Sequence, residues 1–337
     1  MATRSTKRRD ELADDAPLLA AIRAVPNDDA PRAVYADTLL TRGDPRGEMI
    51  AVQLRLSALE GMGPLSRDET EERARLLARQ GELGEAFGRA APNVSAQLHR
   101  GFATRALLRA GGERELTRDP LFHYVLRELV LWQCSPRLVF ELTRSLRREH
   151  LVLLRKVVFN GAVGAENAEA LAGWPPLARL EALRFVKSEL GRDALTTILR
   201  ATRTGALRSL AVFDDDMSGL APALFEVCPS LLRLELSFCN LAVADVAAIV
   251  ANERPLRSLS LNGNRFGDAG VEVLAASEAL ADLEELDLTA CGSTSEGHRA
   301  LARGSLPRRL RLVLERADIE PEDAAALRAR FADLRLS

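Results

Sequence analysis

The chain has 337 residues, of which 47% are hydrophobic and 28% are charged. This length and composition are sufficient to bury a continuous core across two domains. The formal net charge is −2, with 46 basic and 48 acidic residues intermixed along the chain. General nucleic-acid or anionic-membrane binding would need a basic excess on one face, so we expect neither nucleic acid nor membrane as a partner.

The N-terminal segment, residues 1–12, is polar and contains Lys7, Arg8 and Arg9 with no apolar run behind them. It is predicted to be a disordered tail and not a signal peptide. No stretch approaches the roughly 18 apolar residues that a membrane-spanning helix needs. No Cys-x-x-Cys pair occurs among the 4 cysteines, so free thiols in a reducing cytoplasm are expected.

Residues 13–92 have the apolar spacing of helices and predict a small all-α domain. The expected helices lie around residues 18–25, 33–40, 49–59 and 68–87. A cluster of turn residues, 43–47, separates the second helix from the third.

The segment 27–50 resembles the repeat-companion domain, a short helical module that accompanies leucine-rich repeats in some bacteria. The matching residues are Asp29, Pro31, Arg32, Tyr35, Ala36, Asp37, Leu39, Arg42, Gly43, Asp44, Pro45, Arg46, Gly47 and Glu48. That family usually has Trp where this chain has Thr38, and acidic residues where it has Leu40 and Thr41. The segment 99–102 also resembles the family's entry into its repeats. The resemblance implies an architecture but no activity.

The charged residues of this segment allow two interpretations. The residues are Asp37, Arg42, Asp44, Arg46 and Glu48. They could form a polar recognition patch, or they could be helix caps and internal ion pairs that fix one tight turn. We favour the second interpretation.

From residue 126 onward the chain repeats the motif apolar-x-x-apolar-x-apolar. The last apolar residue of successive copies is at 131, 159, 185, 212, 236, 261 and 288, with differences of 28, 26, 27, 24, 25 and 27. Each copy predicts a short parallel strand, and the Ala- and Leu-rich stretches between copies predict helices. Residues 95–115 are expected to form a degenerate repeat or a capping strand. The repeat therefore predicts an α/β solenoid over residues 93–337.

The copy at 256–274 resembles the helix-bearing leucine-rich repeats of the ribonuclease-inhibitor-like class. Its residues read Leu-Arg-Ser-Leu-Ser-Leu-Asn-Gly-Asn-Arg-Phe-Gly-Asp-Ala-Gly-Val-Glu-Val-Leu. The resemblance implies a right-handed solenoid with parallel strands on the concave face and helices on the convex face. Three positions after the third apolar residue, this class places Asn or Cys to satisfy buried backbone groups. The slot holds Cys134, Cys239, Asn264 and Cys291 here, so a structural role is expected for these cysteines.

The outward positions of the strands indicate where a partner would bind. Exposed aromatic and aliphatic side chains clustered on an open sheet are typical of a protein interface. The predicted partner-binding residues are Val130, Trp132, Val158, Val186, Phe213 and Phe238. The alternative is that another part of the chain folds over this surface; we favour the interface.

Two charged patterns allow alternatives. Arg127, Arg155, Arg208 and Arg257 recur at the second motif position, and they form either a solubilising margin paired with carboxylates, which we favour, or a stripe for an acidic partner. The three aspartates 214–216 could hold a divalent cation, but a ladder position and solvated turns are favoured. No cofactor and no metal are expected.

No sequence motif of a P-loop, a nucleophile elbow, a zinc peptidase or a dinucleotide-binding loop occurs. We therefore predict a non-enzymatic protein–protein interaction module. The alternative is a regulator of a nucleotide-hydrolysing enzyme that resembles a GTPase-activating protein, with Arg105 and Arg184 as conceivable contributors. A metal-dependent hydrolase lacks any paired base or nucleophile. The strand expected at 331–336 has no capping unit after it, which predicts a homodimer through its open edge.

Overall fold

A computed structural model describes residues 14–146, 151–202, 205–252 and 255–337. The chain divides into two compact units. The first lies within Met1–Val130 and Arg144–Leu154, and the second within Leu131–Thr143 and Arg155–Ser337. The predicted tail at 1–12 lies outside the described residues, and the domain boundary predicted at 92/93 stays a prediction.

The first unit begins with helices, as predicted for this region. Residues 14–24 are helical and are followed by α2 (Ala30–Thr41), α3 (Pro45–Glu60) and α4 (Arg67–Ala90). Buried apolar side chains join them into one core, which includes Leu19, Ile22, Tyr35, Leu39 and Ile50. None of the helices in the described ranges is long and apolar enough to cross a lipid bilayer.

The turn between α2 and α3 is fixed by charged side chains. Asp44 caps α3 by accepting a hydrogen bond from the Arg46 backbone N–H at 3.0 Å, and it also accepts from the Arg46 guanidinium at 2.9 Å. Arg46 forms a second ion pair with Asp119 at 3.3 Å. A Cβ added at Gly47 would lie 2.6 Å from the Ala36 carbonyl oxygen, so the two helices cross in direct backbone contact.

Other charged residues of the same segment also have intramolecular partners. Arg42 donates to Asp15 at 2.7 Å, and Glu48 accepts from Arg79 at 2.6 Å. Asp37 differs, because it is exposed. These contacts support caps and internal ion pairs over a recognition patch for four of the five residues.

A hairpin follows the helices. Strands β1 (Val94–His99) and β2 (Phe102–Leu108) pair antiparallel through a two-residue turn in which Arg100 and Gly101 have φ of 52° and 82°. Gly101 donates its N–H to Gln53 of α3 at 2.7 Å, and the ring of Phe102 stacks on Tyr35 with centroids 6.2 Å apart. The segment predicted as a degenerate repeat or capping strand therefore includes an antiparallel hairpin in contact with the helices.

Short helices α5 (Glu113–Arg118) and α6 (Pro120–His123) lead to β3 (Glu128–Cys134), whose residues are divided between the two units. Among the described residues, eleven strands follow chain order in one sheet.

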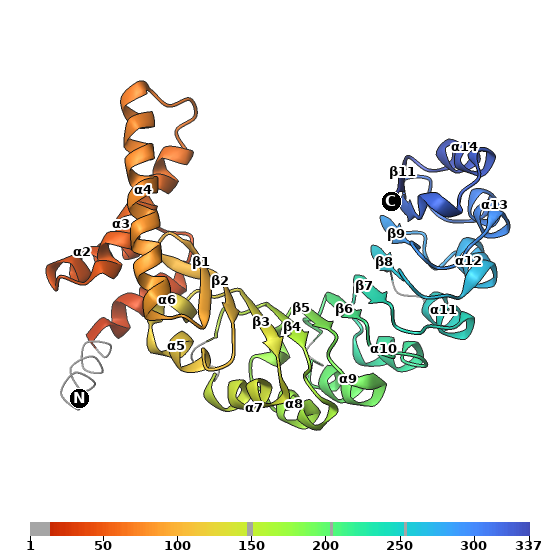
Figure 1. The fold of residues 1–337 in the computed structure, drawn as a ribbon, viewed down its shortest axis with the longest axis horizontal. Coiled ribbons are helices and arrows are strands. Elements are labelled where there is room, and N and C mark those ends of the chain that lie inside the picture. The colour runs from red at the N-terminus through yellow and green to blue at the C-terminus, as the bar shows by residue number, and fades with distance from the viewer. Residues whose placement is uncertain (1–13, 147–150, 203–204, 253–254) are drawn as a thin grey trace. The chain divides into compact units, whose positions relative to one another are not determined.

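Strands and helices alternate through the second unit, as the repeat predicts. From β4 onward the neighbouring strands are parallel. Within this unit the strands line the inner side of an arc and the helices its outer side (Figure 1). The strands are β4 (Lys156–Gly161), β5 (Ala182–Val186), β6 (Ser209–Phe213), β7 (Arg233–Ser237), β8 (Ser258–Ser260), β9 (Glu285–Asp287), β10 (Arg311–Leu314) and β11 (Asp333–Leu336). The helices are α7 (Pro136–Ser145), α8 (Ala168–Ala172), α9 (Gly191–Arg200), α10 (Ala221–Val227), α11 (Val243–Val250), α12 (Gly267–Ala276), α13 (Ser295–Arg303) and α14 (Pro321–Arg330), with 3₁₀ turns at Ala165–Asn167, Leu177–Arg179 and Arg316–Asp318.

The inward residues of each strand form the core of this unit. Leu210 and Val212 of β6 and Leu236 of β7 are all fully buried. Each such side chain contributes about 1.5–3 kcal/mol of burial free energy. That contribution depends on the neighbouring repeat, so a single repeat cannot fold alone.

Asn264 shows how the turn after each strand is satisfied. Its side-chain N–H groups donate to the carbonyls of Leu236 at 2.6 Å and Leu261 at 2.7 Å, and its Oδ1 accepts from the N–H groups of Cys239 at 3.0 Å and Leu241 at 3.1 Å. This fully buried amide joins two repeats, as the ladder position predicts.

Candidate binding surface

The register of the parallel strands aligns the outward side chains in rows across β4–β9. The first row is Lys156, Ala182, Ser209, Arg233, Ser258 and Glu285. The second row is Val158, Arg184, Ala211, Glu235, Ser260 and Asp287. The third row is Asn160, Val186, Phe213 and Ser237. The repeat position of Trp132, just after the third apolar residue of its copy, corresponds to the third row.

An aromatic pair lies at the end of the third row. The rings of Phe213 and Phe238 are 5.2 Å apart between centroids and inclined at 56°. Phe213 is half-buried, whereas 47% of Phe238 is exposed. The Phe238 ring lies over Gly263 of the next repeat, where an added Cβ would come within 2.5 Å of it.

Phe238 occupies a backbone position that recurs in the repeats with positive φ. This position lies two residues after the third apolar residue of each motif. It contains Gln133, Gly161, Lys187, Asp214, Phe238, Gly263 and Ala290. The φ of Phe238 is 54°, in the left-handed region that disfavours bulky side chains. This conformation is not apparent from the apolar pattern, although glycine in two of the copies is a sequence signal for it.

The predicted partner-binding residues differ in their exposure. Trp132 is 41% exposed, and Val158 and Val186 are half-buried. Val130 is only 5% exposed, so its predicted position on the open surface is wrong. Residues 129–131 of β3 are all buried.

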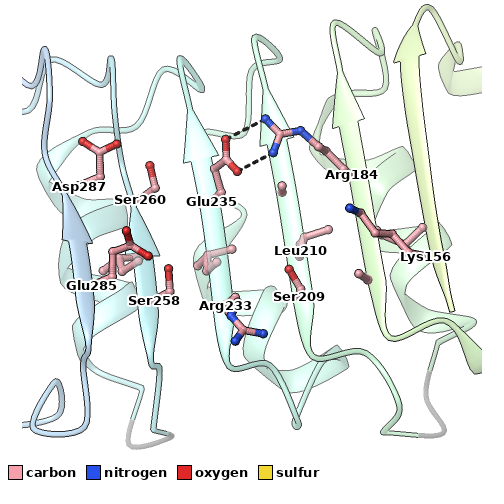
Figure 2. A pocket seen from close by; sticks show the side chains of 15 residues that line it. Lys156, Arg184, Ser209, Leu210, Arg233, Glu235, Ser258, Ser260, Glu285 and Asp287 are labelled. Carbon is pink, nitrogen blue, oxygen red and sulfur yellow. Dashed lines mark hydrogen bonds and ion pairs between the residues drawn. The ribbon is translucent and has the colours of Figure 1, made fainter. Parts of the chain in front are cut away.

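Arg184 and Glu235 form an ion pair across the second row. The guanidinium donates to both carboxylate oxygens, at 2.9 and 3.2 Å. The two residues lie on β5 and β7, and Ala211 of the intervening strand lies in register between them (Figure 2). The methyl side chain of Ala211 leaves room for the pair to cross β6.

The first and second rows enclose a polar hollow of about 380 Å³. Figure 2 shows Lys156 and Arg184 toward one end of the hollow and Glu285 and Asp287, both on β9, toward the other. Small side chains from Ala182, Ala211, Ser209, Ser258 and Ser260 leave the middle open. The residues of the first row occupy the third position of the repeat motif. The residue types at that position are the sequence signal for this hollow.

Two of the four arginines at the second motif position form ion pairs with carboxylates. Arg155 pairs with Glu181 at 3.2 Å, and Arg257 pairs with Glu284 at 3.4 Å. For Arg155 and Arg257, these ion pairs support a solubilising margin over a stripe for an acidic partner.

The aspartates at 214–216 have structural contacts. Asp215 accepts from the Ser188 N–H at 2.9 Å, which places it in the ladder position. The Ser218 N–H donates to Asp216 at 3.0 Å and holds the pKa of that carboxyl below its ordinary value, and Asp214 is exposed. Within the described residues, no group of three or more His, Cys, Asp or Glu side chains is arranged to hold a metal ion.

Two comparisons with known proteins agree with this repeat geometry. Residues 253–275 match the family described as Leucine Rich repeat. The alternating strands and helices of the second unit are consistent with a leucine-rich repeat solenoid. The chain is similar to the ribonuclease inhibitor of Sus scrofa, with 35% identity over 121 aligned residues, and the match covers 33% of this chain and 26% of the inhibitor. The chain thus spans about a quarter of that relative's length.

Proposed function

We propose that this chain is a leucine-rich repeat protein and acts as a non-enzymatic scaffold that binds another protein through the concave face of its repeats. The observation that carries the proposal is the exposure of two large aromatic side chains on this face, Trp132 at 41% and Phe238 at 47%. Exposed aromatic residues are enriched among those that dominate binding energy at protein interfaces. The name of the similar ribonuclease inhibitor, which describes action on another protein, also supports a binding role.

The backbone at Phe238 also bears on this proposal. A non-glycine residue in the left-handed region costs about 1 kcal/mol or more, and such strain concentrates at functional sites. Glycine fills the same position in the next repeat, at Gly263, so the fold itself does not require an aromatic side chain there. The conformation itself recurs at this position with Gln133, Lys187, Asp214 and Ala290, so it belongs to the repeat, and the support for binding comes from the exposed aromatic side chain of Phe238.

The test uses three full-length baits against a lysate of the source organism: wild type, Phe238→Asn, and Phe140→Asn. Asn tolerates the left-handed conformation, so Phe238→Asn should fold normally. Phe140 lies on α7 and is also 47% exposed, which makes it a matched control. We expect a partner retained by wild type and Phe140→Asn and lost by Phe238→Asn. Equal retention by all three baits would reject the concave aromatic site.

A regulator of GTPase type stays an alternative prediction. The two arginines considered for it have carboxylate partners, since Arg184 pairs with Glu235 at 2.9 Å and Arg105 with Glu128 at 3.1 Å. An assay of GTP hydrolysis by candidate small GTPases, with Arg184→Ala as the comparison, separates this alternative from a scaffold.

A homodimer through β11 also stays a proposal. Leu334 and Leu336 are half-buried, while Arg335 and Asp333 place charges on the same strand and pair at 3.5 Å. Charged residues at a strand edge disfavour further pairing. Light scattering over a range of concentrations tests the dimer, and a constant monomer mass would reject it.

A further inference from the structure

The concave face contains a basic side chain whose surroundings suit an anion. Arg233 is exposed in the first row, and its register partners are Ser209 on β6 and Ser258 on β8. Adjacent strands are about 4.8 Å apart, so the two serine side chains flank the base of the arginine. The guanidinium and both hydroxyls are hydrogen-bond donors, and all three residues line the polar hollow.

Two carboxylates on this face, on the same strand as Arg233 or in the same row, form ion pairs with other arginines. Glu235, two residues along the same strand, pairs with Arg184 at 2.9 Å, and Figure 2 shows the Glu235 and Arg233 side chains pointing away from each other along β7. Glu285, in the same row two strands away, pairs with Arg311 at 3.5 Å. In the described part of the chain, no acidic side chain lies within 4.0 Å of the Arg233 guanidinium.

We propose that Arg233, Ser209 and Ser258 form a subsite for the carboxylate of an Asp or Glu side chain on the bound protein. Two guanidinium N–H groups and two hydroxyls match the roughly four acceptor positions of a carboxylate. A single positive charge matches a single negative one. A phosphate dianion would leave one negative charge that the single guanidinium charge does not compensate.

The subsite and the aromatic pair define the spacing of the partner's groups. Arg233 and Ser237 are four residues apart on β7, and Ser237 is in register with Phe213. Four residues of a strand span about 13 Å. The partner is therefore a protein that presents an acidic side chain about 13 Å from an apolar one. This assignment rests on the proposed function, because it describes what the same concave face recognises.

The first test measures the binding of a carboxylate at Arg233 in the full-length protein. The Arg233 Nε–H signal is assigned by NMR from its loss in Arg233→Gln, and N-acetyl-glutamate methylamide is then titrated. We expect a saturable shift of the Arg233 Nε–H signal, which N-acetyl-glutamine methylamide should not produce. The double variant Ser209→Ala, Ser258→Ala should reduce this shift at least twofold. No shift beyond that of Arg200, an exposed arginine on α9, would overturn the subsite. Tighter saturation by inorganic phosphate would overturn its assignment to a carboxylate.

The second test uses a random 16-residue peptide library displayed on phage, selected on wild type. We expect the selected peptides to be enriched in Asp or Glu, and Arg233→Gln to weaken their binding about tenfold or more, while Arg200→Gln leaves it unchanged. Replacing the acidic residue of the peptide should then weaken its binding to Arg233→Gln only a little further. Peptides lost by Phe238→Asn but retained by Arg233→Gln would overturn the subsite and leave the proposed function intact. Peptides retained by both variants, or an empty selection, would count against both.

Discussion

At the residue scale, the cysteines behave as small apolar residues of the core. All 4 are buried and free, and burial raises the pKa of Cys134, Cys239 and Cys291 to about 12 and that of Cys228 to about 11. Because the thiolate is the reactive form, we expect no labelling by iodoacetamide at pH 8 in the folded protein and complete labelling in denaturant. Mass spectrometry of the labelled chain measures this directly, and rapid labelling of any one thiol in the folded protein would contradict it.

The same thiols give a pH dependence of stability. Between about pH 9 and pH 12 the unfolded chain loses thiol protons that the folded protein retains, so the folded state binds more protons there. A raised folded-state pKa contributes stability below the unfolded value and loses it as the pH rises. The free energy of unfolding should therefore fall above about pH 9. Denaturant titrations at pH 8 and pH 10 would show it, and replacing Cys228 by Ala should reduce the difference.

Asn264 carries a further residue-scale prediction. Asn264→Ala would leave the buried N–H groups of Cys239 and Leu241 without an acceptor, at about 1–3 kcal/mol for each group. We expect the free energy of unfolding to fall by about 2–5 kcal/mol. The matched control is Asn262→Ala, two positions earlier and half-buried, which should change it by less than about 1 kcal/mol. Equal losses in chemical denaturation would reject the ladder role.

At the element scale, the crossing of α2 and α3 depends on the absence of a side chain. A Cβ at Gly47 would lie 2.6 Å from the Ala36 carbonyl oxygen and 2.8 Å from the Leu40 backbone nitrogen. Gly47→Ala should therefore separate the helices and lower the free energy of unfolding of the first unit by about 1–3 kcal/mol. Gly81→Ala, in α4 where nothing lies within 4 Å of the added Cβ, should instead raise it by about 0.5–1 kcal/mol. Thermal unfolding of the two variants tests the contrast, which would fail if both shifted in the same direction.

At the scale of the whole molecule, each repeat is stabilised by its neighbours. Strand β6 has neighbours on both sides and fully buried Leu210 and Val212, whereas Leu334 and Leu336 of β11 are half-buried. We expect the amides of β11 to exchange with solvent at least tenfold faster than those of β6. Hydrogen–deuterium exchange by mass spectrometry measures this, and equal protection would indicate that the array opens as one unit.

The periodicity of the sequence determined the repeat and the positions of the strands. A strand alternates its side chains with a period of two, so the apolar motif also fixed which residues face outward, including Trp132 and Phe213. The ladder residues followed from the same register, because Asn264 and the cysteines recur at one position of the motif. The N-terminal helical region followed from its helical apolar spacing.

Tertiary structure alone decided the features that depend on residues distant in the sequence. The pairing of Arg184 with Glu235 requires β5 and β7 to lie on either side of Ala211, and local patterns contain no information about a strand two positions away. Burial of Val130 has the same origin, because exposure depends on what covers a face and not on which face a residue occupies. The hairpin at β1 and β2 and the orientation of Phe238 depend on left-handed backbone angles, which an apolar period does not specify.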